Sequence, residues 1–163
     1  MKKVYLAGPD VFKSNAKEYG EALKRICKEN GLEGLFPLDS EIRAENLTPQ
    51  QLAKKIQEAN IELIRKSDIV VANLSNFRGS EPDSGTVWEV GFAMGLGKKV
   101  IGYSDDLRSL KEKTIEIMNL EKGSKEDKEG LLIEDFGLSH NLMFADIVLC
   151  KEFQEAIEKI KSL

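Results

Sequence analysis

The segment at residues 68–93 restricts the possible folds of this chain more than any other. Residues 69–74 are an apolar run rich in β-branched side chains, which is typical of a strand buried in a parallel sheet. Residues 75–85 are polar and contain two glycines and a proline, so they predict a loop. Apolar residues then recur at the spacing of one helix face, at Val87, Val90 and Met94. This order of strand, loop and helix places the loop at the carboxyl edge of a sheet, where open α/β proteins bind ligands.

The rest of the chain repeats this alternation of strands and helices. We expect further strands at 4–7, 35–38 and 100–103, and helices at 14–30, 48–66, 86–97, 111–120 and 153–160. Residues 147–150 fit either a fifth strand or the end of a helix. Such alternation predicts one α/β domain covering residues 1–163 and built on a parallel sheet.

Composition excludes several classes of protein. The net charge of −4 argues against a general nucleic-acid binder, which needs a basic face. The sequence has no apolar run near the roughly 20 residues of a membrane span, and the strand pattern after Met1 is too short for a secretory signal. Two cysteines in apolar contexts and one histidine form no metal-binding set. We therefore expect a cytoplasmic protein with reduced thiols, without a metal, a membrane contact or a nucleic-acid partner.

Two carboxylates frame the end of the loop at residues 75–85. Asp83 lies on the loop, and Glu89 follows six positions later, in the expected first turn of the helix. The free N–H groups and partial positive charge of a helix N-terminus favour an ionised carboxylate, which suits Glu89 to be a nucleophile or an electrostatic stabiliser. Asp83 lies outside the helix and can carry a proton. Two carboxylates in different environments are the groups that glycosyl transfer uses.

The same residues also fit a purely structural role. Thr86 and Glu89 have the spacing of a capping box, in which the Glu89 carboxylate only accepts a hydrogen bond from the Thr86 N–H. Asp83 or Ser84 is then an ordinary helix cap. Spacing alone leaves capping and catalysis open, and the two roles can overlap.

Residues 83–93 resemble the D-x-G-T-x-x-E-x-G-x-A signature of the nucleoside 2-deoxyribosyltransferase family. Three other segments are similar to that family, in the same order: Tyr5 to Pro9 with Phe12, Asn60 to Asp68, and Asn141 to Met143. Each segment alone is a weak signal, but four in the right order are specific, and together they span most of the chain. The resemblance implies a flavodoxin-like fold, a three-layer sandwich around the parallel sheet, which the short second strand and the chain length also favour.

The resemblance also implies roles for individual residues. Glu89 corresponds to the nucleophile, Asp83 to the group that assists the departing base, and Tyr5 to a residue that hydrogen-bonds the nucleophile and orients it. Gly8 lets the backbone approach a ligand closely because it has no Cβ, although an ordinary turn explains it equally well. Phe12 is a candidate stacking surface for the base, with a core position as the alternative.

Three further residues complete the implied site. Asn60 stands where the family often has an aspartate that binds the sugar or the base edge, and asparagine can donate and accept hydrogen bonds but carries no negative charge. Composition alone favours a solvent-facing position for Asn60. Asn141 and Met143 correspond to residues that reach into a neighbouring subunit's pocket and hold the sugar, which implies a homo-oligomer with shared sites. His140 beside them is expected on the surface.

Arg78, in the loop at residues 75–85, has two interpretations. Its planar, bidentate guanidinium suits a phosphate, which would favour a nucleotide over a nucleoside as substrate. The alternative is a solvated arginine or one that pairs with Glu81.

The leading hypothesis is an enzyme of nucleotide salvage that transfers 2-deoxyribose between purine bases, pyrimidine bases or both. Its partners are small nucleosides and free bases, and a glycosyl-Glu89 intermediate in a double displacement would retain the anomeric configuration. Cleavage of an N-glycosidic bond in this way needs no cofactor. One alternative is a hydrolase of 2′-deoxynucleoside 5′-monophosphates, supported by Arg78 as a phosphate clamp. The other is a non-catalytic nucleotide-binding module in which Glu89 is only a cap.

Overall fold

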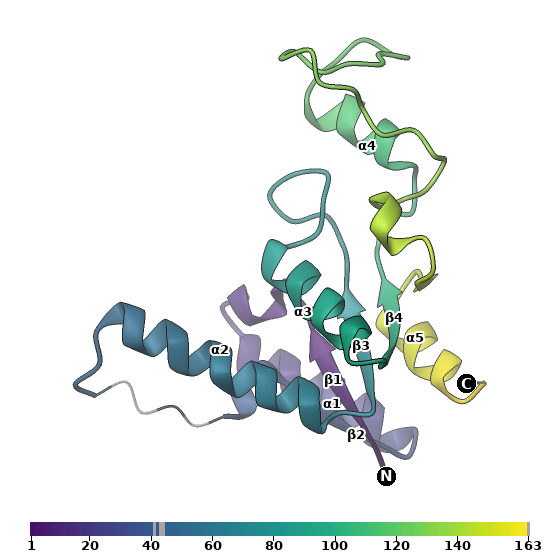
Figure 1. The fold of residues 1–163 in the computed structure, drawn as a ribbon. Helices are drawn as coiled ribbons and strands as arrows, with labels where there is room; N and C mark the ends of the chain where they lie inside the picture. The colour runs from purple at the N-terminus through teal and green to yellow at the C-terminus, as the bar shows by residue number, and fades with distance from the viewer. Residues whose placement is uncertain (41, 43–44, 163) are drawn as a thin grey trace.

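The computed structural model describes residues 1–40, 42 and 45–162, and its centre is a five-stranded sheet (Figure 1). All strand pairs are parallel, in the order β2-β1-β3-β4-β5. The strands are β1 (Lys2–Ala7), β2 (Leu32–Leu35), β3 (Ile69–Asn73), β4 (Lys99–Tyr103) and β5 (Val148–Cys150). The strand order reverses between β1 and β3, so the crevice beside their carboxyl ends is the expected ligand site of such a sheet.

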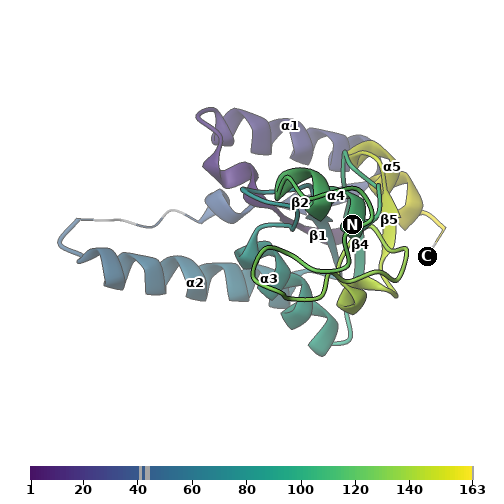
Figure 2. The ribbon, with the colours of Figure 1, turned by 90° about the horizontal axis from the view of Figure 1, so that it is seen from above.

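Helices cover both faces of the sheet. Figure 2 shows α1 (Ala16–Glu29) and α5 (Phe153–Ile160) on one face, and α2 (Pro49–Lys66) and α3 (Ser84–Gly95) on the other. Three short 3-10 helices are also present in the described part of the chain. Two of them follow strands, η1 (Pro9–Phe12) after β1 and η2 (Pro37–Asp39) after β2, and the third, η3 (Leu142–Phe144), precedes β5. The predicted flavodoxin-like three-layer α/β fold is confirmed.

The alternation of side chains along β1 divides the core into two layers. Val4 and Leu6 are buried against the α1 and α5 layer, whereas Tyr5 and Ala7 are buried in the cluster that includes residues of α2 and α3. Successive strand residues point to opposite faces, so the register that pairs Tyr5 with Val70 of β3 fixes the face on which the Tyr5 side chain lies.

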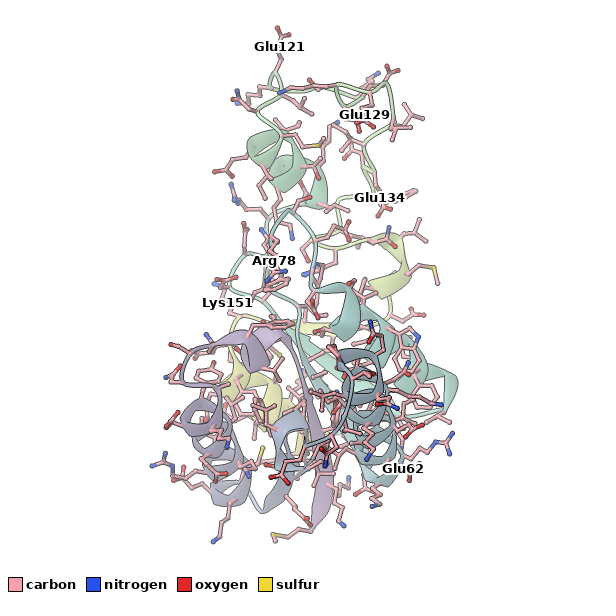
Figure 3. The ribbon with its side chains drawn as sticks, turned by 90° about the vertical axis from the view of Figure 1, so that its left-hand side faces the viewer. Glu62, Arg78, Glu121, Glu129, Glu134 and Lys151 are labelled. Atoms are coloured by element: carbon pink, nitrogen blue, oxygen red, sulfur yellow. The ribbon has the colours of Figure 1, made fainter. Side chains whose placement is uncertain are left out.

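Residues 105–139, which we call the arm, rise beyond the carboxyl edge of the sheet and carry α4 (Leu110–Ile117) (Figures 1 and 3). The two sides of the arm are joined by a Leu110 N–H bond to the Leu138 carbonyl, 2.8 Å long, and by an ion pair between Lys111 and Asp135. The arm is also tied to the loop before α3, because Lys113 Nζ donates to Asn76 Oδ1 over 3.1 Å. Lys113 is 1% exposed, so this is a buried anchor and not a solvated contact.

Several predicted boundaries were wrong. The second strand covers Leu32–Leu35 instead of 35–38, because Pro37 lacks an N–H and opens η2, whose Asp39 accepts from the Phe36 N–H. The first helix begins at Ala16 after Asn15, and not at Ser14. Residues 148–150 pair with β4, so the segment that fitted either a strand or the end of a helix forms a strand. The polar composition of residues 39–46 favours an irregular segment, of which residues 41, 43 and 44 lie outside the described residues.

Both cysteines, Cys27 and Cys150, are free and buried. In the part of the chain that the structure describes, no helix combines the length and the apolar character needed to cross a bilayer.

Candidate active site

Glu89 is the centre of a polar cluster between β1, α2 and α3. Its Oε1 accepts a hydrogen bond of 2.7 Å from the Tyr5 hydroxyl and a longer one of 3.4 Å from Asn60 Nδ2. Tyr5 is fully buried at the sheet, and the Glu89 side chain is partly buried above it. The structure therefore brings together three of the predicted site residues, from three separate elements of the chain.

Asp83 is the N-cap of α3. Its Oδ2 accepts from the Thr86 N–H at 2.9 Å and from the Thr86 hydroxyl at 3.1 Å. The helix consequently begins at Ser84, two residues before the predicted start. The prediction of a capping box between Thr86 and Glu89 was wrong, because the Thr86 N–H is bonded to Asp83. The Glu89 carboxylate is therefore available to accept the hydrogen bond from Tyr5. The alternative that Asp83 is a helix cap is confirmed.

Burial controls the ionisation of Glu89. The pKa of Glu89 is raised from 4.5 to about 7, chiefly because burial removes hydration and also because of the nearby charge of Asp83, while the hydrogen bonds from Tyr5 and Asn60 offset part of the rise. The expected bias toward the ionised form is not observed, because Glu89 is the sixth residue of α3 and lies beyond the free N–H groups of the first turn. Burial and the Glu89 charge raise the pKa of Tyr5, so Tyr5 remains a hydrogen-bond donor.

Asn60 is oriented by Glu89 instead of by solvent. Its Nδ2 points to Glu89, and its Oδ1 is buried without a hydrogen-bond partner among the described residues. The solvent-facing position favoured by composition was therefore wrong. A buried acceptor without a donor is costly, so Asn60 Oδ1 is suited to receive an N–H or O–H from a bound molecule.

A pocket of about 400 Å³ opens beside this cluster, between α2 and α3. Its lining includes Ala53, Ile56, Gln57, Asn60, Gly85, Trp88 and Glu89. Its walls are largely apolar, with Glu89 and Asn60 as the polar groups, which is the usual composition of a small-molecule site. Trp88 is 49% exposed and gives the rim a large aromatic surface.

Gly8 and Phe12 lie on the neighbouring loop after β1. A Cβ on Gly8 would stand 2.8 Å from the Asn73 Cβ, so a glycine is required where this loop crosses β3. Phe12 is 62% exposed, stacks on Phe77 with 5.5 Å between ring centroids, and lines a second pocket on the α1 and α5 side of the sheet. It is not among the residues that line the Glu89 pocket.

Arg78 stacks on aromatic rings. Its guanidinium lies 4.6 Å from the Phe77 ring centroid and 5.7 Å from that of Phe12. Within the described ranges it forms no ion pair with Glu81, so the predicted pairing was wrong, whereas its exposed side chain agrees with the solvated form of the same alternative.

The segment with Asn141 and Met143 forms a tight turn at the base of the arm. Asn141 caps η3 with a 3.0 Å bond from the Met143 N–H, and Met143 is 74% exposed. His140 is 2% exposed, and its Nε2 lies 2.8 Å from the Leu74 carbonyl, so the predicted surface position was wrong. Burial lowers the pKa of His140. The contact between His140 and the Leu74 carbonyl attaches this turn to the end of β3.

Sequence reasoning missed Glu134. Its carboxylate accepts from Asn141 Nδ2 at 2.8 Å and from the Leu142 N–H at 2.6 Å. Glu134 and Asp135 stand among mostly apolar neighbours, and the separation of Glu134 from its partners by seven and eight residues matches no local motif, so the sequence contains no signal for this contact.

The described residues contain no group of three or more histidine, cysteine, aspartate or glutamate side chains placed to hold a metal ion. The Glu89 cluster allows the chemistry of a partly buried carboxylate. Glu89 has one oxygen fixed by Tyr5 and Asn60, and it faces a pocket of the size of a small organic molecule.

Comparison with known proteins finds relatives in both sequence and structure. An uncharacterised protein of Schizosaccharomyces pombe, C191.05c, is 32% identical over 155 aligned positions, in a match that covers 86% of this chain and 74% of that protein. The solved structure of a 2-desoxiribosyltransferase from Leishmania mexicana matches with a TM-score of 0.78 and 33% identity, over 99% of this chain and 98% of that one.

A 2-deoxyribosyltransferase structure from Bacillus psychrosaccharolyticus matches with a TM-score of 0.59 and 18% identity, over 95% of this chain and 90% of that one, which supports the fold alone. The sequence model of the family described as nucleoside 2-deoxyribosyltransferase matches residues 4–143, the segment that runs from β1 through the Glu89 cluster to the Asn141 turn. With this match over most of its length, the chain belongs to the nucleoside 2-deoxyribosyltransferase family.

Proposed function

We propose that the protein transfers 2-deoxyribose from a 2′-deoxynucleoside to a free base by double displacement, with Glu89 as the nucleophile. The observation that supports this most directly is the 2.7 Å hydrogen bond from the buried Tyr5 hydroxyl to Glu89 Oε1, at the wall of a pocket. This bond and the contact from Asn60 hold one carboxylate oxygen, so Oε2 is the atom directed at the substrate. Family membership supports the same activity.

In the first step, a lone pair of Glu89 Oε2 forms a bond to C1′, and the bond from C1′ to the base nitrogen breaks. The electron pair of that bond stays on the nitrogen, which receives a proton from the Asp83 carboxyl. In the second step, a nitrogen of the incoming base attacks C1′, Glu89 departs as a carboxylate, and the N–H proton of that base returns to Asp83. Each step inverts C1′, so the product retains the configuration of the donor.

The surroundings of Glu89 fit this role. A carboxylate that has lost part of its hydration is a stronger nucleophile, and the raised pKa of Glu89 reports that loss. Tyr5 and Asn60 fix the direction of the carboxylate, which reduces the entropy lost on reaching the reactive geometry. Asp83 uses only Oδ2 for its bonds to Thr86. Oδ1 is therefore the atom through which it would exchange a proton with the base.

The decisive experiment is chromatography of the protein incubated with 2′-deoxyinosine and adenine. Formation of 2′-deoxyadenosine together with hypoxanthine is the expected result, and Glu89→Ala should form neither product while keeping its far-UV circular dichroism. Hypoxanthine with free deoxyribose would instead assign a hydrolase, to be tested next with 2′-deoxynucleoside monophosphates. Binding of 2′-deoxyinosine without any turnover would assign a non-catalytic module and refute the proposal.

We further propose that Asn141 and Met143 serve the site of a neighbouring subunit, so that the enzyme is a homo-oligomer. The 74% exposure of Met143 in the single chain supports this. Mixed oligomers, reassembled from inactive Glu89→Ala and weakened Asn141→Ala proteins, contain some sites with both native residues if the sites are shared. Transfer activity above that of Asn141→Ala alone is the expected outcome, and a mixture no more active than that component would assign Asn141 to its own subunit's site.

A further inference from the structure

Glu134 is the only side chain among the described residues that bonds both the amide of Asn141 and the backbone of the turn that follows it. One carboxylate oxygen, Oε2, accepts from Asn141 Nδ2 at 2.8 Å, and the other, Oε1, accepts from the Leu142 N–H at 2.6 Å. Both distances are those of charge-assisted hydrogen bonds. Figure 3 shows Glu134 at the lower end of the arm, far from the exposed Glu121 and Glu129 at its tip.

These bonds determine which atoms of Asn141 remain available. Its Oδ1 accepts from the Met143 N–H, and one of its two amide hydrogens is committed to Glu134. One N–H and one lone pair are left to face a ligand, in a plane fixed by bonds at both ends of the amide. A single cap would hold only one end of the amide, so the second bond, from Glu134, serves orientation in addition to the stability of the turn.

The connection of Glu134 to the rest of the site strengthens this interpretation. The neighbouring Asp135 is anchored to α4 by its ion pair with Lys111. Burial raises the pKa of Glu81, in the loop that leads to Asp83, and the negative charge of Glu134 adds to this rise. Glu134 therefore stands between the Asn141 turn and the loop before α3, although it lies outside the pocket that contains Glu89.

We propose that Glu134 is a positioning residue for the transfer reaction, which fixes the amide of Asn141 in the orientation that holds the deoxyribose of the donor. The proposal rests on the proposed function, because it assumes that Asn141 contacts the sugar. Glu134 itself touches neither substrate nor Glu89, so its effect must pass through Asn141. This dependence separates an orienting role from a merely stabilising one.

The test is a double-mutant cycle of Glu134→Ala and Asn141→Ala, with kcat and KM measured for donor and acceptor. Glu134→Ala is expected to lower kcat/KM for the deoxynucleoside roughly tenfold, chiefly through KM for the donor, because an interaction with the sugar is lost in the ground state as well as in the transition state. KM for the acceptor base should not change. The double variant should be no less active than Asn141→Ala alone, and Glu134→Asp should recover part of the loss.

Glu129→Gln is the matched control, because Glu129 is an exposed acid of the same arm, and it should leave all constants unchanged. Multiplicative effects of the two substitutions, or an equal loss for donor and acceptor, would overturn the positioning role. A wild-type protein without turnover would overturn the proposed function instead. In that case the same cycle is measured as the Kd of 2′-deoxyinosine by calorimetry on the Glu89→Ala background, and additive changes in binding free energy again overturn the role of Glu134.

Discussion

Replacement of Glu89 by glutamine should stabilise the folded protein at neutral and alkaline pH. Glutamine has nearly the same shape and keeps an acceptor oxygen for the Tyr5 hydroxyl and for Asn60 Nδ2, which now bond Oε1 of the glutamate. It removes the ionised form that burial disfavours. A gain in stability that accompanies a complete loss of transfer activity is therefore the expected result.

The size of the effect follows from the pKa of Glu89. The folded protein holds this proton up to about pH 7, whereas an exposed glutamate loses it near 4.5. The stabilisation by the bound proton is therefore complete below pH 4.5 and is lost as the pH rises through about 7. Each tenfold change in proton affinity corresponds to about 1.4 kcal/mol, so the ionised Glu89 should cost about 3 kcal/mol at pH 8.

Urea unfolding followed by far-UV circular dichroism, at one protein concentration and at about pH 5 and about pH 8, measures this cost. The stability advantage of Glu89→Gln should be about 3 kcal/mol at the higher pH and under about 1 kcal/mol at the lower. Glu18 on the exposed side of α1 provides the control, and Glu18→Gln should give the same small difference at both values. An advantage of Glu89→Gln that does not change with pH would refute the reasoning, because a pure packing effect has no proton dependence.

Three other substitutions test neighbouring parts of the site. Tyr5→Phe removes a donor to Glu89, so it should lower kcat/KM by at least about tenfold and move the pH midpoint of kcat/KM upward, as a pH profile would reveal. Asn60→Asp replaces a donor by a second negative charge and should also raise that midpoint, and a midpoint that is unchanged or lower would contradict the assignment. Gly8→Ala places a methyl group 2.8 Å from the Asn73 Cβ and should reduce the free energy of unfolding by roughly 1–3 kcal/mol, with wild-type stability as the contrary result.

The fold was predictable where local signals and long-range packing agree. The helix at 49–66 begins with a capping box between Thr48 and Gln51, and both of its hydrogen bonds are present in the structure. The apolar β-branched run at 69–73 is a buried central strand, as its composition predicts. In these segments the residues that favour an element are also the residues that the rest of the molecule buries or caps.

The second strand shows where this agreement fails. Residues 32–35 contain a glutamate and a glycine, which argue against a strand, whereas the apolar residues 35–38 argue for one. A Cβ on Gly34 would approach the Cys27 Sγ and Lys24 on α1 to 3.2 Å or less, so the glycine permits α1 to lie close to β2. The need for a glycine is set by Lys24 and Cys27 of α1, which lie ten and seven positions earlier in the chain, so no local sequence pattern predicts it.

The contacts made by the Asn141 turn were hidden for a related reason. His140 and Glu134 are polar residues in a segment of mixed composition, and both bond groups that a sequence cannot place, namely the Leu74 carbonyl and the Asn141 amide. The resemblance to a family identified Asn141 through its motif. The residues that hold a motif residue in place have no motif of their own, because many side chains in many positions can supply the same hydrogen bond.

The choice between capping and catalysis for Glu89 depended on which residue begins α3. Thr86 and Asp83 are both good N-caps, so the sequence offered two starting points three residues apart. With Thr86 as the cap, Glu89 would lie in the first turn, bonded to backbone N–H groups that favour its charge. With Asp83 as the cap, Thr86 is buried to 1% exposure, and Glu89 moves into the second turn, where its only bonds from described residues come from Tyr5 and Asn60. The shift removes Glu89 from the end of the helix and places it against β1, and this position gives the carboxylate both a fixed direction and a pKa of about 7.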